Sequence, residues 1–179
     1  MKGRHLSPAT LLASGAPTRY LLPYLLNLLV NRTNQTWRQT LRAHGLTVSR
    51  WQILSILIAL DGCRVTTLAE LAGETQPVTS RVVDQMERDD LVERRADPQD
   101  ARVSSVWLTT AGREIFFALI PDAGGMVDDF TAALDEDEVD VLAGLLTRML
   151  ANTPGGIGPV DALEDVPFTV HRAPTGANS

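Results

Sequence analysis

The chain has 179 residues, of which 44% are hydrophobic and 5% aromatic, and a formal net charge of −6. This length suits one domain with a sizeable core, and the abundance of Leu, Ala and Val favours helices. The negative charge excludes a protein that binds nucleic acid over its whole surface, but it leaves room for a local contact patch.

Charge is divided unevenly along the chain. Residues 1–60 hold seven basic residues and no acidic one, whereas residues 61–179 hold nine basic and 22 acidic residues. We therefore expect the basic first part to pack against the acidic last part. Cys63 is the single cysteine, so no disulfide can form within the chain and a cytoplasmic location is expected. The apolar run 20–30 is too short to span a bilayer, so no membrane anchor is expected.

The first third of the chain predicts an arm and two helices. Residues 1–18 are rich in Pro, Gly and Ser and are predicted to form an N-terminal arm. Apolar residues then recur at helical spacing over 19–44, up to the helix-stopping Gly45. The segment SRWQ predicts a capping box with Ser49 as the N-cap of the next helix, which runs through ILSILIAL.

Two shorter helices joined by a tight turn follow, which is typical of a helix-turn-helix. The segment TLAE predicts that the first begins at Thr67 and ends near Gly73. Thr75 is predicted to cap the second, which runs to about Arg88 with Pro77 in its first turn. Both helix starts can offer free N–H groups to DNA phosphates, so Thr67 and Thr75 are candidate phosphate contacts.

The second of these helices has two unlike faces when its residues are placed at steps of 100°. One face holds Thr79, Val82, Val83 and Met86, and the other holds Pro77, Ser80, Arg81, Asp84 and Arg88. A helix that enters the major groove needs short polar side chains in its first turns, so Gln76, Pro77, Ser80 and Arg81 are the candidate base-reading residues. The alternative interpretation is an ordinary solvated helix face.

A charged hairpin is predicted directly after this helix. The β-type runs 91–94 and 103–108 flank a turn that contains Pro98. Such a hairpin is typical of the wing of a winged helix, whose tip can enter the minor groove. Arg102 is the candidate for that groove, Asp100 can orient it, and Arg94 and Arg95 would lie near the phosphates. A charge-compensated surface hairpin is the alternative, because residues 75–105 hold five arginines and seven acidic residues.

The remaining segments predict helices and a tail. A helical region starts at Thr109 or Thr110 and reaches about residue 130. The acidic segment DEDE has capping-box spacing and leads into the apolar run 139–150. Residues 152–179 lack helical periodicity and are predicted to form a C-terminal tail.

The sequence resembles the MarR family of transcription regulators. The matching segments are HGLTVSRWQIL (44–54), the recognition helix and wing (78–112, with the pattern D-x-R-x-x-x-V-x-L-T-x-x-G from Asp100 to Gly112) and the last helix (134–150). Two departures stand out. Asp90 occupies the position where the family usually has a glycine ending the recognition helix, and the wing has one arginine fewer than many members carry.

The resemblance implies a mainly α fold, a winged helix-turn-helix with a small two- or three-stranded β wing and dimerisation helices at both ends. The expected units are the arm (1–18), the first dimerisation helix and junction (19–48), the DNA-binding lobe (49–108), the dimerisation helices (109–151) and the tail (152–179). The implied function is that of a homodimeric regulator, a repressor, on a pseudo-palindromic site in double-stranded DNA.

The family resemblance also implies a small amphipathic or phenolic ligand that releases DNA. The candidate residues for its cleft are Trp37, Arg38, His44, Trp51, Arg113 and Phe116. Ordinary core packing at the junction is the alternative for each of them.

Other classes of function are less well supported by the sequence. The three histidines are far apart, so no metal site or other cofactor is expected, and no catalytic motif indicates an enzyme. Redox sensing by Cys63 is a minor alternative. A winged helix that serves protein assembly without specific DNA contact is the main rival.

Overall fold

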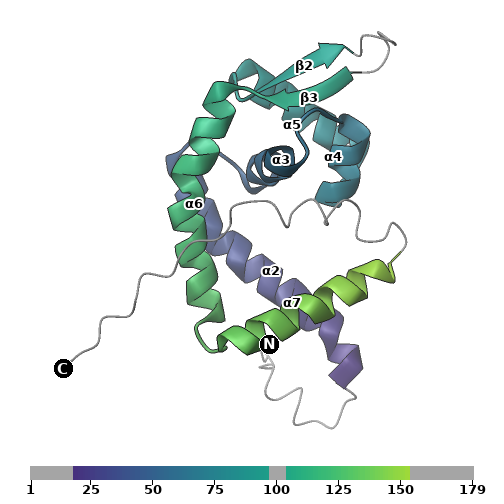
Figure 1. Cartoon of the computed structure of the whole chain (residues 1–179), viewed down its shortest axis with the longest axis vertical. Helices are drawn as coiled ribbons and strands as arrows, with labels where there is room; N and C mark the ends of the chain where they lie inside the picture. The colour runs from purple at the N-terminus through teal and green to yellow at the C-terminus, as the bar shows by residue number, and fades with distance from the viewer. Residues whose placement is uncertain (1–17, 97–103, 154–179) are drawn as a thin grey trace, which may run out of the picture.

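Helices form most of the molecule, and a small antiparallel sheet packs against several of them. The computed structural model describes residues 18–96 and 104–153. The elements in chain order are α2 (Thr18–Ala43), α3 (Val48–Ala59), β1 (Cys63–Arg64), α4 (Val65–Ala72), α5 (Gln76–Arg88), β2 (Val92–Ala96), β3 (Ser104–Leu108), α6 (Thr110–Thr131) and α7 (Glu136–Ala151). The predicted mainly α fold with a small β wing is confirmed (Figure 1).

Two predicted helix starts were wrong by about two residues. The N-cap of α3 is Thr47, not Ser49, and its side chain accepts a hydrogen bond from the backbone N–H of Arg50. Gly45 (φ +69°) ends α2, and the extended backbone at Thr47 lets α3 begin at once. Helix α4 begins at Val65, so Thr67 lies inside its first turn and is not the N-cap. The cause is β1, which delivers an extended Arg64 directly to the helix.

Three antiparallel strands form the sheet in the order β1-β3-β2. Val92 lies opposite Leu108 in the wing hairpin, and Cys63 lies opposite Val106 on the other edge of β3. β1 was not predicted, because a two-residue strand has no periodicity to detect. The pairing of β1 with β3 joins the start of α4 to the wing, so the two keep a fixed position relative to one another.

The core lies where α3, α4, α5, the sheet and the first half of α6 meet the end of α2. The largest completely buried side chains include Phe116, Leu41, Ile53, Leu54, Leu57, Leu68, Met86 and Leu119. We call this part, from α3 to β3 with the packed parts of α2 and α6, the lobe. In Figure 1 it occupies the upper half, and α6 runs from it down one side of the molecule.

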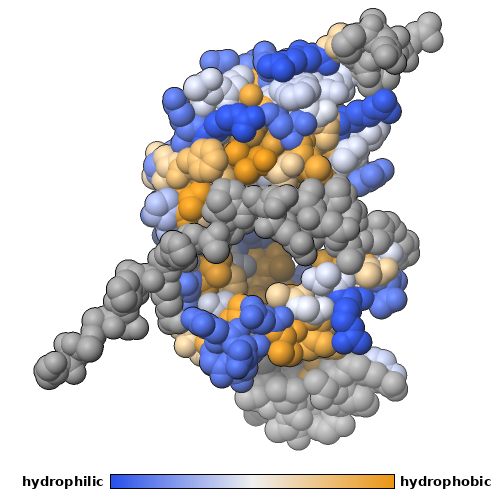
Figure 2. All heavy atoms as spheres, viewed as in Figure 1, coloured by the Kyte–Doolittle hydropathy of each residue, from blue (hydrophilic) through white to orange (hydrophobic). Residues whose placement is uncertain are grey.

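The other end of the molecule, which we call the base, is the first half of α2, the end of α6 and α7. The predicted capping box at the start of α7 is confirmed: Asp135 and Glu138 each accept a hydrogen bond from the other's backbone N–H. No residue of α7 is buried. Figure 2 shows this helix low in the view, blue at its acidic start and orange beyond it. Within the described ranges, no helix is long and apolar enough to cross a membrane.

Candidate nucleic-acid interface

Helix α5 presents the predicted polar face to solvent. Gln76, Pro77 and Arg81 are exposed and Ser80 is partly exposed. On the opposite side Thr79, Val83 and Met86 are buried in the core. The two-faced character of this helix is confirmed, because the lobe anchors it by its aliphatic side and leaves its first turns free.

Thr75 and Pro77 shape the free start of α5. Thr75 is the N-cap, as predicted, but its side chain makes no capping hydrogen bond. Pro77 lies in the first turn, where it removes no intrahelical bond. The Thr75 hydroxyl therefore stays available to a group outside the chain.

A polar groove of about 560 Å³ runs between the start of α4, the free face of α5 and the wing. Its walls are formed by Arg64, Val65, Thr66, Gln76, Ser80, Asp84, Arg94 and Ser104. Two of the predicted base-reading residues therefore share a concave surface with the wing. Arg81 lies on the same face of α5, where it has no ion pair with a described residue.

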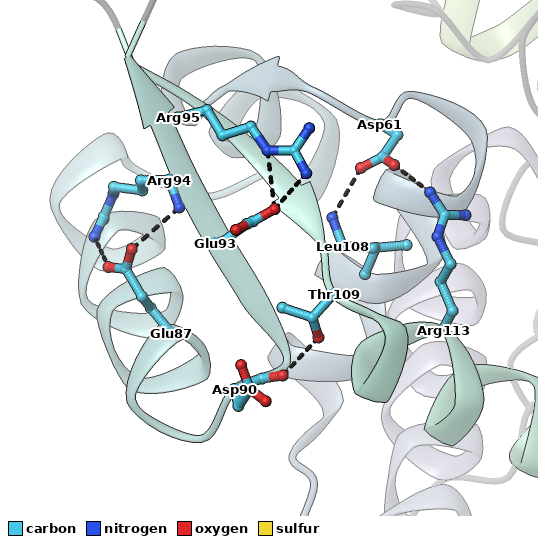
Figure 3. A network of polar contacts seen from close by, with 9 residues as sticks. All are labelled: Asp61, Glu87, Asp90, Glu93, Arg94, Arg95, Leu108, Thr109 and Arg113. Atoms are coloured by element: carbon cyan, nitrogen blue, oxygen red, sulfur yellow. Dashed lines mark hydrogen bonds and ion pairs between the residues drawn. The ribbon is translucent and has the colours of Figure 1, made fainter.

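Arg94, a predicted phosphate contact, is held by two carboxylates of α5. Its guanidinium lies 2.7 Å from Glu87, and its backbone N–H donates to Glu87 over 3.1 Å (Figure 3). Asp84 lies 2.6 Å from the same guanidinium. These contacts tie the wing to the recognition helix. They also neutralise the arginine, since the three side chains together carry a charge of about −1 at pH 7.

Arg95, the second predicted wing cation, lies on the outer side of the sheet. Its guanidinium contacts Glu93, with Nε 2.9 Å from the carboxylate, and stacks 4.7 Å from the ring centre of Trp107. Trp107 in turn covers Gly62 (φ +80°), where a Cβ would overlap the indole. Arg95 remains half-exposed, so it can still meet an anion from solvent.

The predicted wing-tip residues Asp100 and Arg102 lie outside the described residues. Their roles rest on the sequence alone.

Polar contacts connect the start of α6 to the rest of the lobe. Asp61 accepts a hydrogen bond of 2.8 Å from the backbone N–H of Leu108 and forms an ion pair with Arg113 (Figure 3). The Thr109 hydroxyl, at the N-cap of α6, donates to the carbonyl of Asp90 over 2.5 Å. Asp90 has φ +57°, so a residue in the left-handed conformation directly follows the C-cap of α5. Sequence reasoning missed Asp61, since its partners are distant in the chain.

The six predicted cleft residues are only partly brought together. The Trp51 ring stacks on Phe116 at 4.8 Å and meets Trp37 edge-on at 5.3 Å. Trp37 is buried, and its indole Nε1 has no hydrogen-bond partner among the described residues. Arg38 and His44 are exposed, while Arg113 is engaged by Asp61. Trp51 thus contacts both of the other rings where α2, α3 and α6 meet.

Cys63 does not have the properties of a reactive thiol. Burial, with a smaller contribution from nearby Asp61, raises its pKa to about 11. A thiol reacts as its thiolate, so a raised pKa lowers its reactivity near neutral pH. In the part of the chain that the structure describes, no three His, Cys, Asp or Glu side chains gather in a group able to hold a metal ion.

Comparison with known sequences points to one family. The MarR family profile matches residues 46–104, from the end of the α2–α3 connection into β3. The transcriptional regulator HosA of Escherichia coli O111:H- is 29% identical over 105 residues, which cover 59% of this chain and 78% of HosA. The regulator MhqR of Bacillus subtilis is 24% identical over 119 residues, which cover 66% of this chain and 82% of MhqR.

Solved structures agree with the sequence comparison. A MarR-family transcriptional regulator from Silicibacter pomeroyi is 34% identical with a TM-score of 0.68, covering 74% of this chain and 90% of that one. The Staphylococcus aureus MepR–DNA complex is 25% identical with a TM-score of 0.65, covering 73% of this chain and 97% of MepR. The lobe, its two-faced α5 and these likenesses agree: the chain belongs to the MarR family of DNA-binding transcription regulators, which are not enzymes.

Proposed function

We propose that the protein is a repressor that binds a pseudo-palindromic operator as a homodimer and is released by a small amphipathic or phenolic ligand. The observation that carries the DNA-binding part is the free face of α5. It offers short polar side chains and an arginine, while the opposite face is locked in the core. A helix held in this way can enter the major groove without losing its packing.

Each candidate contact has a distinct role in this proposal. Gln76 pairs with adenine, Ser80 donates or accepts at a base edge, and Arg81 reaches guanine or a phosphate. Thr75 is better placed than Thr67 to contact a phosphate, because Thr75 is exposed and its hydroxyl makes no capping bond. Pro77 lies in the first turn of α5, where its missing N–H removes no intrahelical hydrogen bond.

The wing completes the proposed contact with DNA. In this proposal Arg102 enters the minor groove and Asp100 orients it. Arg94 and Arg95 lie at the base of the wing, and there the carboxylates around Arg94 reduce what it can offer a phosphate.

The base supports the homodimer. Helix α7 has 16 residues and buries none of them, and Val141 is 62% exposed. Further large apolar side chains of the base are exposed: Tyr20, Leu22, Tyr24, Leu29, Val30, Val127, Phe130, Leu134, Leu142, Leu145, Met149 and Leu150. A surface of this kind is normally covered by another subunit. A two-fold axis through it would hold two α5 helices about one DNA turn apart, roughly 34 Å.

The aromatic cluster supports the ligand part. A buried indole N–H without a partner is unusual, because such a group normally finds an acceptor. A phenolic or carboxylate oxygen beside Trp37 would supply one, with Arg38 and His44 as exposed polar groups on neighbouring segments. Binding of the ligand between α2, α3 and α6 would change the orientation of the lobe relative to the base.

The proposal is tested by selecting bound fragments from genomic DNA with the purified full chain. We expect enrichment of fragments that share a pseudo-palindrome, and retardation of such a fragment in a gel. Arg81→Ala and Arg102→Ala should each weaken that binding, whereas Arg42→Ala, which removes an exposed cation from the last turn of α2, should not. A phenolic ligand that quenches tryptophan fluorescence should release the DNA. Failure to enrich any shared sequence would contradict the proposal.

A second candidate function is protein assembly without specific DNA contact. The observation that favours it is that both described wing arginines, Arg94 and Arg95, already have carboxylate partners. Under this alternative the selected fragments share no sequence, and Arg81→Ala leaves the binding of DNA unchanged.

A further inference from the structure

We infer that Arg64, at the junction of β1 and α4, is a phosphate-contacting residue of the DNA-facing groove, in the role that the wing sequence suggests for Arg94. The inference rests on the proposed function, because it names a further residue of the same interface. Two arginines, Arg64 and Arg94, line the groove, and they differ in whether carboxylates contact them.

Arg94 is poorly suited to bind a phosphate. Asp84 and Glu87 both contact its guanidinium, at 2.6 and 2.7 Å, and its side chain is only 25% exposed. A phosphate that approached Arg94 would meet two carboxylates at nearly the same distance, so the summed interaction would be repulsive. The conformation of Arg94 is accordingly fixed by α5, and its role is to position the wing.

Arg64 has the opposite surroundings. It is exposed, it lines the same groove as Gln76 and Ser80, and it has no ion pair or side-chain hydrogen bond with a described residue. Its guanidinium therefore keeps its full charge and its donors for an external anion.

The backbone of Arg64 is held rigidly enough to direct such a contact. Arg64 pairs with Ser105 in the sheet and is at the same time the N-cap residue of α4. The stem of its side chain thus starts from a point fixed both to the wing and to the helix-turn-helix. A cation placed there would set the distance between the DNA backbone and the first turn of α5, as phosphate contacts set register in other complexes.

The experiment measures binding of the full chain to two labelled duplexes by fluorescence anisotropy. One duplex is a fragment selected by the wild-type protein, and the other has the same composition in scrambled order. Titrations are repeated between about 50 and 200 mM salt, because the slope of log K against log salt counts neutralised phosphates. The variants are Arg64→Gln, Arg64→Lys and the control Arg42→Ala, each checked for an unchanged melting temperature.

Arg64→Gln should make the slope shallower by about 2 for a dimer, one contact for each chain, on both duplexes. The ratio of affinities for the two duplexes should stay the same, since a phosphate contact carries no sequence information. Arg64→Lys should restore most of the slope, and Arg42→Ala should leave it unchanged.

A triple variant separates the roles of the two arginines. Asp84→Asn/Glu87→Gln/Arg94→Gln removes the whole ion-paired group, so the slope should stay unchanged or become slightly steeper if Arg94 contacts no phosphate. A shallower slope in the triple variant, or an unchanged slope in Arg64→Gln, would overturn the inference while leaving the proposed function intact. Absence of salt-dependent binding by the wild-type protein would instead overturn the proposed function.

Discussion

The lobe and the base differ in how their helices are stabilised. Helix α3 buries Ile53, Leu54, Ile56 and Leu57 within the chain, whereas α7, which is longer, buries nothing. Short isolated helices are marginal in water, so a helix without a packed face needs another partner to become stable. The comparison teaches that the lobe is packed within one chain, while the proposed homodimer would supply the packing that α7 lacks in the base.

The largest expected effect comes from charging the exposed face of α7. Leu142→Lys/Leu145→Lys should weaken dimerisation by at least about a thousandfold, because unpaired ammonium groups would be buried in the interface. Sedimentation velocity measures this directly. Thr147→Lys on the same helix is the control and should leave the dimer intact. A double variant that still sediments as a dimer would show that α7 is not the interface.

Two adjacent phenylalanines of α6 allow the stability contributed by a core side chain to be compared with that of a surface side chain. Phe116 is completely buried and stacks on Trp51, while Phe117 is 49% exposed. Phe116→Ala should lower the free energy of unfolding by about 3–5 kcal/mol, and Phe117→Ala by about 1 kcal/mol. Urea unfolding followed by circular dichroism measures both. Equal losses would mean that α6 is not anchored in the lobe through Phe116.

Cys63 reports on the integrity of the lobe. Its pKa, raised from 9.0 to about 11 by burial, keeps the thiol protonated at pH 8. Alkylation by iodoacetamide should therefore be about a hundredfold slower than in urea-unfolded protein, since the thiolate fraction falls by that factor. The same raised pKa means that its contribution to stability is complete below pH 9.0 and is lost as the pH rises towards about 11. Equal alkylation rates in both states would contradict the burial of this side chain.

A buried hydroxyl in α5 offers a way to stabilise the lobe. The Thr79 Oγ1 is buried, and no partner for it is present among the described residues. Thr79→Val keeps the shape and removes the unpaired group, so the protein should gain about 1 kcal/mol in the free energy of unfolding. The exposed Thr36→Val in α2 serves as the control and should change little. A loss of stability in Thr79→Val would show that the hydroxyl does have a partner.

The smallest effect concerns the end of the recognition helix. Asp90 adopts φ +57°, so Asp90→Gly should raise the free energy of unfolding by about 0.5–1 kcal/mol. Asp89→Gly should have the opposite sign, because Asp89 has φ −91° and pairs with Arg50 at 2.6 Å. Thermal melting of the two variants gives the comparison, and shifts in the same direction would contradict it.

Local patterns predicted much of this structure correctly. The 3.6-residue period identified the helices and the two faces of α5, and the capping box at Asp135 marked the start of α7. Each of these features depends on residues that are close in the sequence.

Features that depend on distant contacts could not be predicted in this way. The partners of Arg94 lie on α5. Asp84 and Glu87 reach it only because β2 packs beside that helix. The same holds for Asp61, which meets Leu108 and Arg113 across the fold. Strand β1 shifted the start of α4 for the same reason, since its pairing with β3 fixes Arg64 in extended form.

Hydroxyl-radical footprinting of a selected fragment, with the mass of the complex measured on the same sample, tests the central claim most directly. We expect two chains on each duplex and two protected patches whose centres lie about 10–10.5 base pairs apart. One chain on each duplex with a single protected patch would show that the base does not join two copies, and would contradict the account.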